Sequence, residues 1–236
     1  MNSEIALDIV NIYKHFDISS DNFFFKKKTL KKISALKNIT LQIKKADRIG
    51  LIGRNGSGKS TLCKIISGIT YPTSGIIKIN GKVSSVLEAG TGFEPELTGY
   101  ENIFIGGAIL GMSRLKIAKK IDSIIKFSEL EEYINVPLKK YSTGMIIKLA
   151  FAVVSFLDGD IIILDEILAV ADEKFRKKCI NKIIQECKKN NKTLLLVSHD
   201  LRNITQCCNK VLYLKNGEVA AFGNVKDTII KYQKEI

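Results

Sequence analysis

The residues best suited to chemistry in this chain form a glycine-rich stretch, Gly53-Arg54-Asn55-Gly56-Ser57-Gly58-Lys59-Ser60. An apolar run precedes the stretch and a segment with helical spacing follows it, which is the context of a G-x-x-x-x-G-K-S phosphate loop. The glycines let successive N–H groups point at phosphate oxygens, and the N-terminus of the following helix adds donors and partial positive charge. The stretch therefore predicts that the chain binds a nucleoside triphosphate.

Within this loop we expect Lys59 to reach the β- and γ-phosphates and the Ser60 hydroxyl to sit on Mg²⁺. The expected nucleotide-binding residues of the loop are Gly53, Arg54, Asn55, Gly56, Ser57, Gly58, Lys59, Ser60 and Thr61. Apolar residues then recur with the spacing of a core-facing helix, at Leu62, Ile65, Ile66 and Ile69.

A pair of carboxylates, Asp165-Glu166, directly follows the continuous apolar run Ile161–Leu164. Such a run is typical of a central parallel strand, and open α/β sheets bind ligands at the carboxyl ends of their strands. An acidic pair alone is weak evidence, but downstream of a phosphate loop it is interpreted as a Walker B element. Asp165 is then expected to hold Mg²⁺ and Glu166 to polarise an attacking water as the catalytic base.

His199 ends another apolar run, Leu194–Ser198. A histidine at the end of a strand is usually structural. Because this one is expected on the same sheet edge as Asp165 and Glu166, a catalytic contact to the γ-phosphate is the better interpretation.

A third candidate is the segment Tyr141-Ser142-Thr143-Gly144-Met145, which precedes an almost wholly apolar predicted helix over 145–157. A serine and a glycine at a helix N-terminus can bind a phosphate through hydroxyl and N–H donors. An ordinary serine N-cap has the same pattern, and spacing alone does not choose between the two.

Periodicity and turn signals predict the elements that position these residues. Strands are expected over 5–12, 36–43, 76–79, 83–87, 161–164 and 193–197, with a hairpin over 211–222 around Asn216-Gly217. A helix is expected from a Thr98/Glu101 capping box to about Gly111. The next is expected to begin at Ser113, with an apolar stripe of Leu115, Ala118, Ile121 and Ile125. Further helices are expected over 173–189 and, as a short helix, after Asp200. Residues 92–142 therefore form a helical insert between β-rich parts.

Residues 17–35 differ in character, because Phe23-Phe24-Phe25 is followed by Lys26-Lys27-Lys28 and then Lys31-Lys32. Aromatic residues beside lysines can dip into a membrane interface or cover a partner. A loop whose phenylalanines pack on the adjacent sheet explains the same pattern, and the sequence leaves both interpretations open.

The composition favours a globular protein over a membrane-spanning or secreted one. The chain has 236 residues, 45% of them hydrophobic, which is enough for one good core. It shows no apolar run of bilayer-spanning length and no signal peptide, and its five cysteines lack C-x-x-C spacing and are expected in the core. A cytoplasmic protein is expected. The formal charge of +13 would suit nucleic acid or an anionic membrane, but most lysines are scattered, which favours simple solvated faces.

Taken together, these motifs resemble the nucleotide-binding subunit of an ABC transporter, with Ser142 and Gly144 on the defining positions of the LSGGQ signature. The resemblance runs over essentially the whole chain and narrows to the branch that exports O-antigen, capsule and teichoic acid. The segments that carry this narrower resemblance are Leu97–Asn102, Phe127–Leu130, Pro137, Leu149–Ala152 and Asp165–Asp172 with Phe175 and Cys179.

The resemblance implies an α/β P-loop NTPase fold: a RecA-like core with an N-terminal antiparallel β subdomain and an inserted helical subdomain. One ABC ATPase domain would span 1–236, with the core in 1–91 and 143–236 and the helical insert in 92–142. A head-to-tail homodimer is implied, in which two ATP molecules each lie between the phosphate loop of one copy and the signature segment Tyr141, Ser142, Thr143, Gly144 and Met145 of the other.

The resemblance also implies roles for single residues. Phe16 would stack on adenine, with Tyr13 as the alternative, and Asp172 of the D-loop would couple the two sites. The family's usual glutamine between sheet and helical insert is missing, and Glu88 is the nearest candidate for its contact to the metal or its water.

The implied function is ATP-driven export of a lipid-linked polysaccharide through a separate integral membrane permease, with this chain as a peripheral protein on the cytoplasmic face. Helix 100–111 would pass the movement to that subunit. Some O-antigen exporters carry a carbohydrate-binding domain after the ATPase, which we do not expect in this chain. The alternative, an ABC ATPase acting on nucleic acid or ribosomes, is less favoured because no second cassette, coiled-coil arm or DNA-binding extension is visible.

Overall fold

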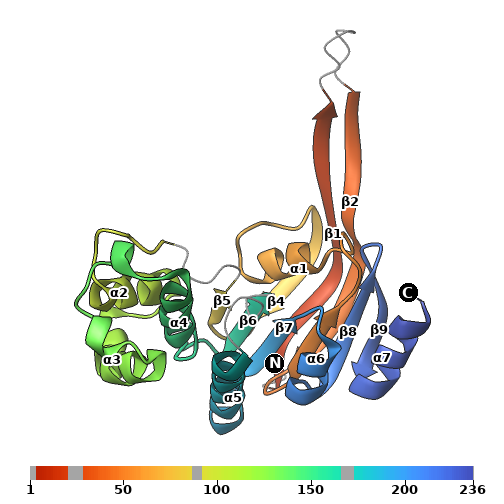
Figure 1. Ribbon diagram of the computed structural model, residues 1–236. Helices are drawn as coiled ribbons and strands as arrows, with labels where there is room; N and C mark the ends of the chain where they lie inside the picture. The colour runs from red at the N-terminus through yellow and green to blue at the C-terminus, as the bar shows by residue number, and fades with distance from the viewer. Residues whose placement is uncertain (1–3, 21–28, 87–91, 166–172, 236) are drawn as a thin grey trace. The chain divides into compact units, whose positions relative to one another are not determined.

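A computed structural model of the chain describes residues 4–20, 29–86, 92–165 and 173–235 (Figure 1). These residues fall into two compact units, Met1–Gly81 with Leu196–Ile236 and Lys82–Leu195. The first unit contains the phosphate loop, and the second contains Asp165 and the segment Tyr141–Met145.

An antiparallel sheet opens the first unit. It comprises β1 (Ile5–Ser20), β2 (Thr29–Lys44) and β4 (Ser74–Ile79) in the order β2-β1-β4. Leu7, Ile9 and Ile12 on β1 are fully buried. The spacing changes from two to three because a register shift lies between Ile9 and Ile12, and the bulge keeps the next apolar side chain on the core face. This sheet is the antiparallel β part that the resemblance implies.

The hairpin of β1 and β2 is longer than the sequence pattern predicts (Figure 1). The expected strands ended at Ile12 and began at Leu36, whereas pairing continues to Ser20 and Thr29. Residues 17–20 and 29–35 are therefore strand and not insertion loop. These residues are strand because they pair with the opposite strand, and such pairing cannot be predicted from local composition. The aromatic and basic residues 23–28 lie outside the described residues.

The rest of the first unit surrounds the phosphate loop. Strand β3 (Arg48–Ile52) pairs in parallel with β8 (Lys210–Lys215), and β8 forms an antiparallel hairpin with β9 (Glu218–Asn224). The described part of the unit also contains the helices α1 (Lys59–Ile66), α6 (Leu201–Cys207) and α7 (Val225–Lys234). The expected stripe on α1 holds for Leu62, Ile65 and Ile66, but the helix ends there and Ile69 is 60% exposed.

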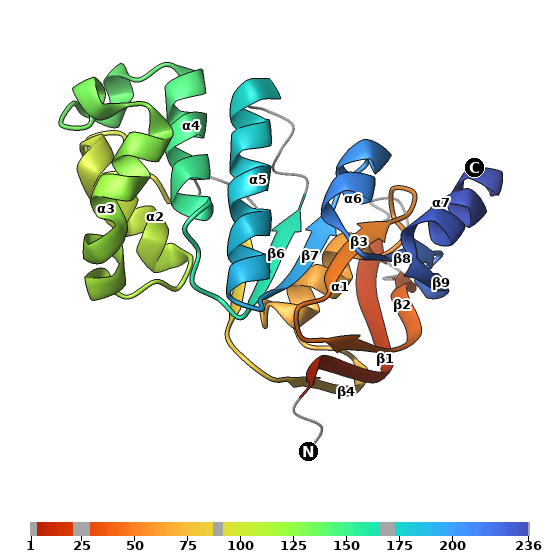
Figure 2. The same cartoon turned by 90° about the horizontal axis from the view of Figure 1, so that it is seen from below.

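The second unit contains a parallel part and a helical part (Figure 2). Strand β5 (Val83–Val86) pairs in parallel with β6 (Ile161–Asp165), and β7 (Thr193–Val197) follows in the strand order. Helix α5 (Glu173–Lys189) connects β6 to β7, with the bounds that periodicity predicts. The core residues of β6 and β7 are almost completely buried, as expected of central strands.

Helices α2 (Gly99–Ile109), α3 (Arg114–Ser128) and α4 (Thr143–Val154) share one apolar core. The face of α3 differs from the expected stripe, because Ile117, Ile121 and Ile124 are buried while Leu115 is 77% exposed. Packing against α2 and α4, rather than the longest apolar series, decides which face is inside. Since α4 belongs to this core, a helical subdomain limited to 92–142 stays a prediction.

All five cysteines are buried, as expected of small core residues. Burial raises the pKa of Cys207 to about 11, which keeps its thiol protonated and inert at neutral pH. Within the described ranges, no helix has the length and apolar character needed to cross a membrane.

Candidate nucleotide-binding site

The phosphate loop lies between β3 and α1 and depends on its glycines at two points. Gly58 has φ +101°, and a Cβ there would lie 2.6 Å from the Ala35 carbonyl oxygen. Gly53 has φ +152°, and a Cβ there would lie 2.3 Å from the Leu214 carbonyl oxygen. The loop thus combines backbone angles that L side chains rarely adopt with close backbone approach, which is why both positions require glycine.

Lys59 places a cation inside this loop. Its side chain is buried, and Nζ donates to the carbonyl oxygens of Gly53 at 2.9 Å and Arg54 at 3.2 Å. Burial of an ammonium is costly unless it is hydrogen-bonded, so these carbonyls hold the charge in place beside the start of α1.

The donors present fit a bound triphosphate. The buried Lys59 ammonium and the exposed Ser60 residue stand at the N-terminus of α1, which carries no acidic residue in its first turn. The Ser57 hydroxyl is buried without a hydrogen-bond partner among the described residues. A helix N-terminus with a buried cation and no acidic residue in its first turn attracts an anion.

Two segments that are distant in the sequence, around Ala35 and Gly217, contact the phosphate loop. In β2, Lys14 pairs with Leu36 but His15 with Ser34, so Ala35 is an extra residue in a bulge. The Ala35 carbonyl oxygen lies against Gly58 and also 2.8 Å from the Cβ position of Gly217. In addition, the Gly217 N–H donates to the Ser57 carbonyl oxygen at 3.2 Å.

The sequence predicts Asn216-Gly217 only as a hairpin turn, and the φ angles of +51° and +83° confirm that turn. Its contact with the phosphate loop and the role of Ala35 were missed. The only signal available was the turn itself, because both contacts depend on pairing between segments far apart in the chain.

The aromatic candidates for adenine lie on β1. Phe16 is 43% exposed, and Lys14 Nζ lies 5.0 Å from the centroid of its ring. Tyr13 is half-buried, with its ring 6.4 Å from that of His15, whose Nδ1 lies 2.8 Å from Ser34 Oγ. Phe16 therefore presents the more accessible aromatic surface, and its role in stacking stays a prediction.

His199 follows β7 and is exposed. Asp200 then caps α6, since its Oδ1 accepts from the Arg202 N–H at 2.9 Å. The turn is tied further by the Asp200 N–H, which donates to Ser198 Oγ at 3.1 Å. His199 belongs to the same compact unit as the phosphate loop.

Asp165 closes β6 and is half-buried after four buried residues. The second carboxylate of the pair, Glu166, lies outside the described residues, as do Glu88 and Asp172. In the part of the chain that the structure describes, no group of three or more His, Cys, Asp or Glu side chains could hold a metal. A magnesium ion needs no such cage, because it is commonly bound by one or two protein oxygens together with substrate phosphates.

The segment Tyr141–Met145 begins helix α4. Ser142 is the N-cap, and its hydroxyl accepts from the Met145 N–H at 3.2 Å. Residues Ser142, Thr143 and Gly144 are exposed, whereas Tyr141 is buried. The serine is thus a true N-cap, and phosphate binding by the exposed residues beside it stays a prediction.

Tyr141 anchors this segment to the start of α2. Its hydroxyl donates to the Tyr133 carbonyl oxygen at 2.6 Å and lies 2.3 Å from the Cβ position of Gly99. Burial raises the pKa of Tyr141, which keeps the hydroxyl protonated as a donor. The predicted Thr98 capping box is present, with the Glu101 N–H donating to Thr98 Oγ1 at 3.2 Å.

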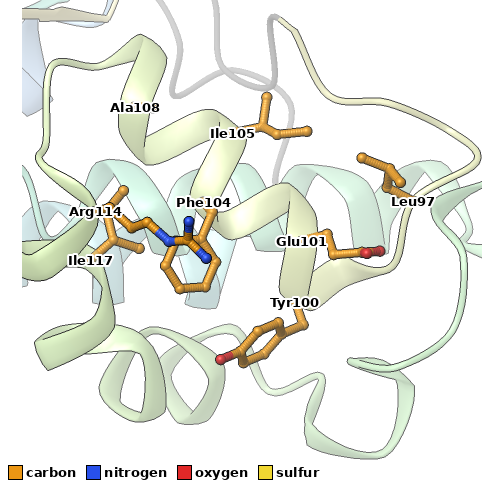
Figure 3. A pocket seen from close by; sticks show the side chains of 8 residues that line it. All are labelled: Leu97, Tyr100, Glu101, Phe104, Ile105, Ala108, Arg114 and Ile117. Atoms are coloured by element: carbon orange, nitrogen blue, oxygen red, sulfur yellow. The ribbon is translucent and has the colours of Figure 1, made fainter.

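A pocket of about 480 Å³ is lined by residues of α2 and α3 (Figure 3). Its lining residues are Leu97, Tyr100, Glu101, Phe104, Ile105, Ala108, Arg114 and Ile117. The rings of Tyr100 and Phe104 are 5.5 Å apart, and the Arg114 guanidinium lies 6.0 Å from the Phe104 ring centroid. The pocket is therefore mainly apolar with one acidic and one basic side chain, a pattern the sequence analysis did not find.

Comparison with known proteins identifies the family of the chain. A family model described as ABC transporter matches residues 36–169, more than half of the chain. An O-antigen export system ATP-binding protein RfbB of Klebsiella pneumoniae is 41% identical over 86% of this chain and 82% of its own length. A protein of the same name from Myxococcus xanthus is 42% identical over the whole chain, which spans 56% of that relative.

A teichoic acids export ATP-binding protein TagH of Lactiplantibacillus plantarum is 36% identical over 99% of this chain and 66% of its own length. Among solved structures, a dimeric ATP-binding cassette in a post-hydrolysis state, bound to ADP and Pi, matches with a TM-score of 0.74 and 25% identity. That match covers 93% of this chain and 98% of the cassette. The chain therefore belongs to the ABC transporter family, among the ATP-binding subunits of O-antigen and teichoic acid exporters.

Proposed function

We propose that this chain is the ATP-hydrolysing subunit of an exporter that moves a lipid-linked polysaccharide across the cytoplasmic membrane. The observation that carries the proposal is the 41% identity with the Klebsiella pneumoniae O-antigen export protein, which extends over most of both chains. The phosphate loop, with its buried lysine and its glycines at positive φ, supplies the chemistry that such a subunit needs.

Nucleotide binding would begin at the phosphate loop. Lys59 is held close to the start of α1 and would pair with the β- and γ-phosphates, while the N–H groups of the loop bind their oxygens. Phe16 would add a stacking surface for adenine through its exposed ring.

Hydrolysis would use a water activated on the far side of the γ-phosphate. Glu166 is proposed to accept the proton of that water, and His199 to donate a hydrogen bond to the γ-phosphate. Ser60 and Asp165, with Glu88 as a further candidate, would hold a magnesium ion. When bound, that ion would neutralise developing charge on the phosphate oxygens.

A complete site would require a second copy of the chain. Ser142 and the exposed N–H groups at the start of α4 would bind the nucleotide held by the other copy, with Asp172 coupling the two sites. Exposure of Ser142, Thr143 and Gly144 supports this role, because an anion can reach the helix N-terminus. The similar dimeric cassette adds further support.

The pocket on α2 and α3 is proposed to receive an apolar segment of the integral membrane partner. Tyr100 and Phe104 would supply its apolar contacts, and Glu101 and Arg114 would orient the segment through charge. The polysaccharide would thus be handled by the membrane partner rather than by this chain directly.

The test of the composite site is the Glu166→Gln substitution. This variant should bind ATP but not hydrolyse it, so ATP with Mg²⁺ should convert the purified chain from monomer to dimer in gel filtration. The double variant Lys59→Ala/Glu166→Gln is the matched control and should remain monomeric, because the phosphates lose their closest cation. A monomer in the single variant at saturating ATP would contradict the proposal.

A further inference from the structure

Glu129 joins the end of one helix to two other helices in the second unit. It is the C-cap of α3, with φ +61°, and its carboxylate turns toward the neighbouring helices. Oε1 accepts from Lys178 Nζ of α5 at 2.7 Å, and Oε2 accepts from Lys148 Nζ of α4 at 3.3 Å. One side chain therefore ties α4 and α5 to the end of α3.

Aromatic rings extend this contact. Lys178 Nζ lies 4.6 Å from the ring centroid of Phe127, and Lys148 Nζ lies 5.3 Å from that of Phe175. Lys178 Nζ also lies 5.5 Å from the ring centroid of Phe175, which is 2% exposed, so both cations pack against this buried ring. We call Glu129, Lys148, Lys178, Phe127 and Phe175 the Glu129 clamp.

The clamp has more contacts than an isolated surface ion pair. Lys178 also donates to the Phe127 carbonyl oxygen at 2.9 Å, which fixes its ammonium at the end of α3. The hydrogen bond from Lys178 lowers the pKa of Glu129, so the carboxylate is charged at neutral pH. Isolated exposed ion pairs contribute little, but one carboxylate shared by two ring-packed cations has its geometry set by several contacts at once.

The helices that the clamp joins carry the candidate site. Lys148 lies on α4, whose first residues are the signature segment, and Lys178 lies on α5, which begins at Glu173 directly after the segment containing Glu166 and Asp172. A small rotation of α4 about its own axis would displace the N–H groups beside Ser142. Binding groups must be held to within roughly 0.5 Å to act, and packed supporting side chains supply that precision.

We propose that Glu129 is a positioning residue that holds the signature helix α4 against α5 and so presents Ser142 and Gly144 to the nucleotide bound by a second copy of the chain. This inference rests on the proposed composite site. Its distinctive consequence is directional, because the clamp of one copy acts on the nucleotide of the other copy and not on its own.

A pairing assay with two different copies tests this direction. The receiving copy carries Glu166→Gln and holds ATP in its own phosphate loop. The presenting copy carries Lys59→Ala, so it has no nucleotide of its own and contributes only its signature segment. Immobilising the presenting copy and titrating the receiving copy with ATP and Mg²⁺ gives the Kd of a single composite site.

Adding Glu129→Gln to the presenting copy should raise this Kd about fivefold, which corresponds to roughly 1 kcal/mol of binding free energy. The same substitution in the receiving copy should leave the Kd unchanged. A purely structural role would weaken pairing equally in both arrangements, and that result would overturn the inference, as would no weakening in either.

Three variants of the presenting copy complete the design. Lys178→Arg keeps the charge and should preserve pairing. Lys177 forms an ion pair with Glu173 on the same helix, and the two side chains are 65% and 69% exposed. Lys177→Met removes this exposed ion pair and should also leave the Kd unchanged. Ser142→Ala should abolish pairing. If the two copies without a clamp substitution fail to pair in ATP, the composite site itself is wrong, which separates that failure from failure of the clamp.

Discussion

At Gly58 the phosphate loop has no room for a side chain, which makes this residue a sharp test of the loop. A Cβ would lie 2.6 Å from the Ala35 carbonyl oxygen and 2.7 Å from Leu36 Cδ2, at φ +101°. Gly58→Ala should therefore push the loop away from β2 and reduce ATP affinity at least ~10-fold, about 1.4 kcal/mol. Titration with a fluorescent ATP analogue measures this loss.

Gly56→Ala is the matched control for Gly58. Gly56 also has positive φ, +77°, but nothing lies within 4 Å of its Cβ position. Only the conformational strain of roughly 1–2 kcal/mol then applies, without displacement of the loop by contact. If both variants lost the same unfolding free energy and the same ATP affinity, contact with the Ala35 bulge would not support the loop.

Single residues were predictable where their chemistry is local. A phosphate loop can be predicted from the glycines, Lys59 and Ser60, because the spacing of these residues along the backbone is sufficient to form the anion site. Ala35 carries no such signal, since an alanine carbonyl acquires its role only through a bulge opposite His15. Glu88, Glu166 and Asp172 lie outside the described residues, so their proposed roles stay predictions.

Between elements, the Tyr141 hydroxyl is expected to stabilise the link from α2 to the signature segment. Tyr141→Phe removes its 2.6 Å hydrogen bond and leaves the Tyr133 carbonyl oxygen without that donor. The free energy of unfolding should fall by about 1 kcal/mol, because a partly buried hydrogen bond is lost while the ring packing remains. Thermal unfolding should show a decrease in Tm of roughly 2–4 °C for a chain of this size.

The control for this substitution is Tyr133→Phe. Tyr133 supplies the accepting carbonyl from its backbone, and its ring is 48% exposed, so losing its hydroxyl should change stability by less than about 0.5 kcal/mol. Equal shifts in the two variants would show that the hydroxyl of Tyr141 contributes nothing specific. ATP binding at the phosphate loop should be unaffected in both.

Elements with strong local signals were predicted closely, and those decided by tertiary pairing were not. Helix α5 and strand β7 have the predicted bounds because periodicity and burial agree over their whole length. The extended part of the β1–β2 hairpin was missed, since Asp17 and Lys32 suggest a loop until they face each other across the ladder. The prediction that Leu115 lies on the buried face of α3 was wrong, because tertiary packing also decides which face is inside.

For the whole molecule, the charge of +13 was the least informative property. Several of its lysines cap carbonyl groups at the ends of helices. Lys120 donates to Phe156 O at 3.0 Å, and Lys192 donates to Leu157 O at 3.0 Å, both just after α4. These cations serve the fold, which agrees with the interpretation that the net charge comes from scattered lysines rather than from a nucleic-acid surface.

Attachment to the proposed membrane partner is tested at the pocket on α2 and α3, where Arg114 is an exposed lining residue. Arg114 is the first residue of α3, so Arg114→Glu places a negative charge where the helix dipole favours it. It also sets two carboxylates in one pocket, beside Glu101. We expect about 10-fold weaker binding to the partner, roughly 1.4 kcal/mol, with unchanged ATP affinity.

The measurement is the share of the chain recovered with membranes from its native cells, followed by ATP turnover of the purified complex. Lys119→Glu is the matched control, because it makes the same charge change on an exposed position of α3 that does not line the pocket. If Arg114→Glu and Lys119→Glu release the chain from membranes to the same extent, net charge and not the pocket governs attachment. Release by Arg114→Glu alone would assign the partner to this pocket, since only there does the new charge meet Glu101.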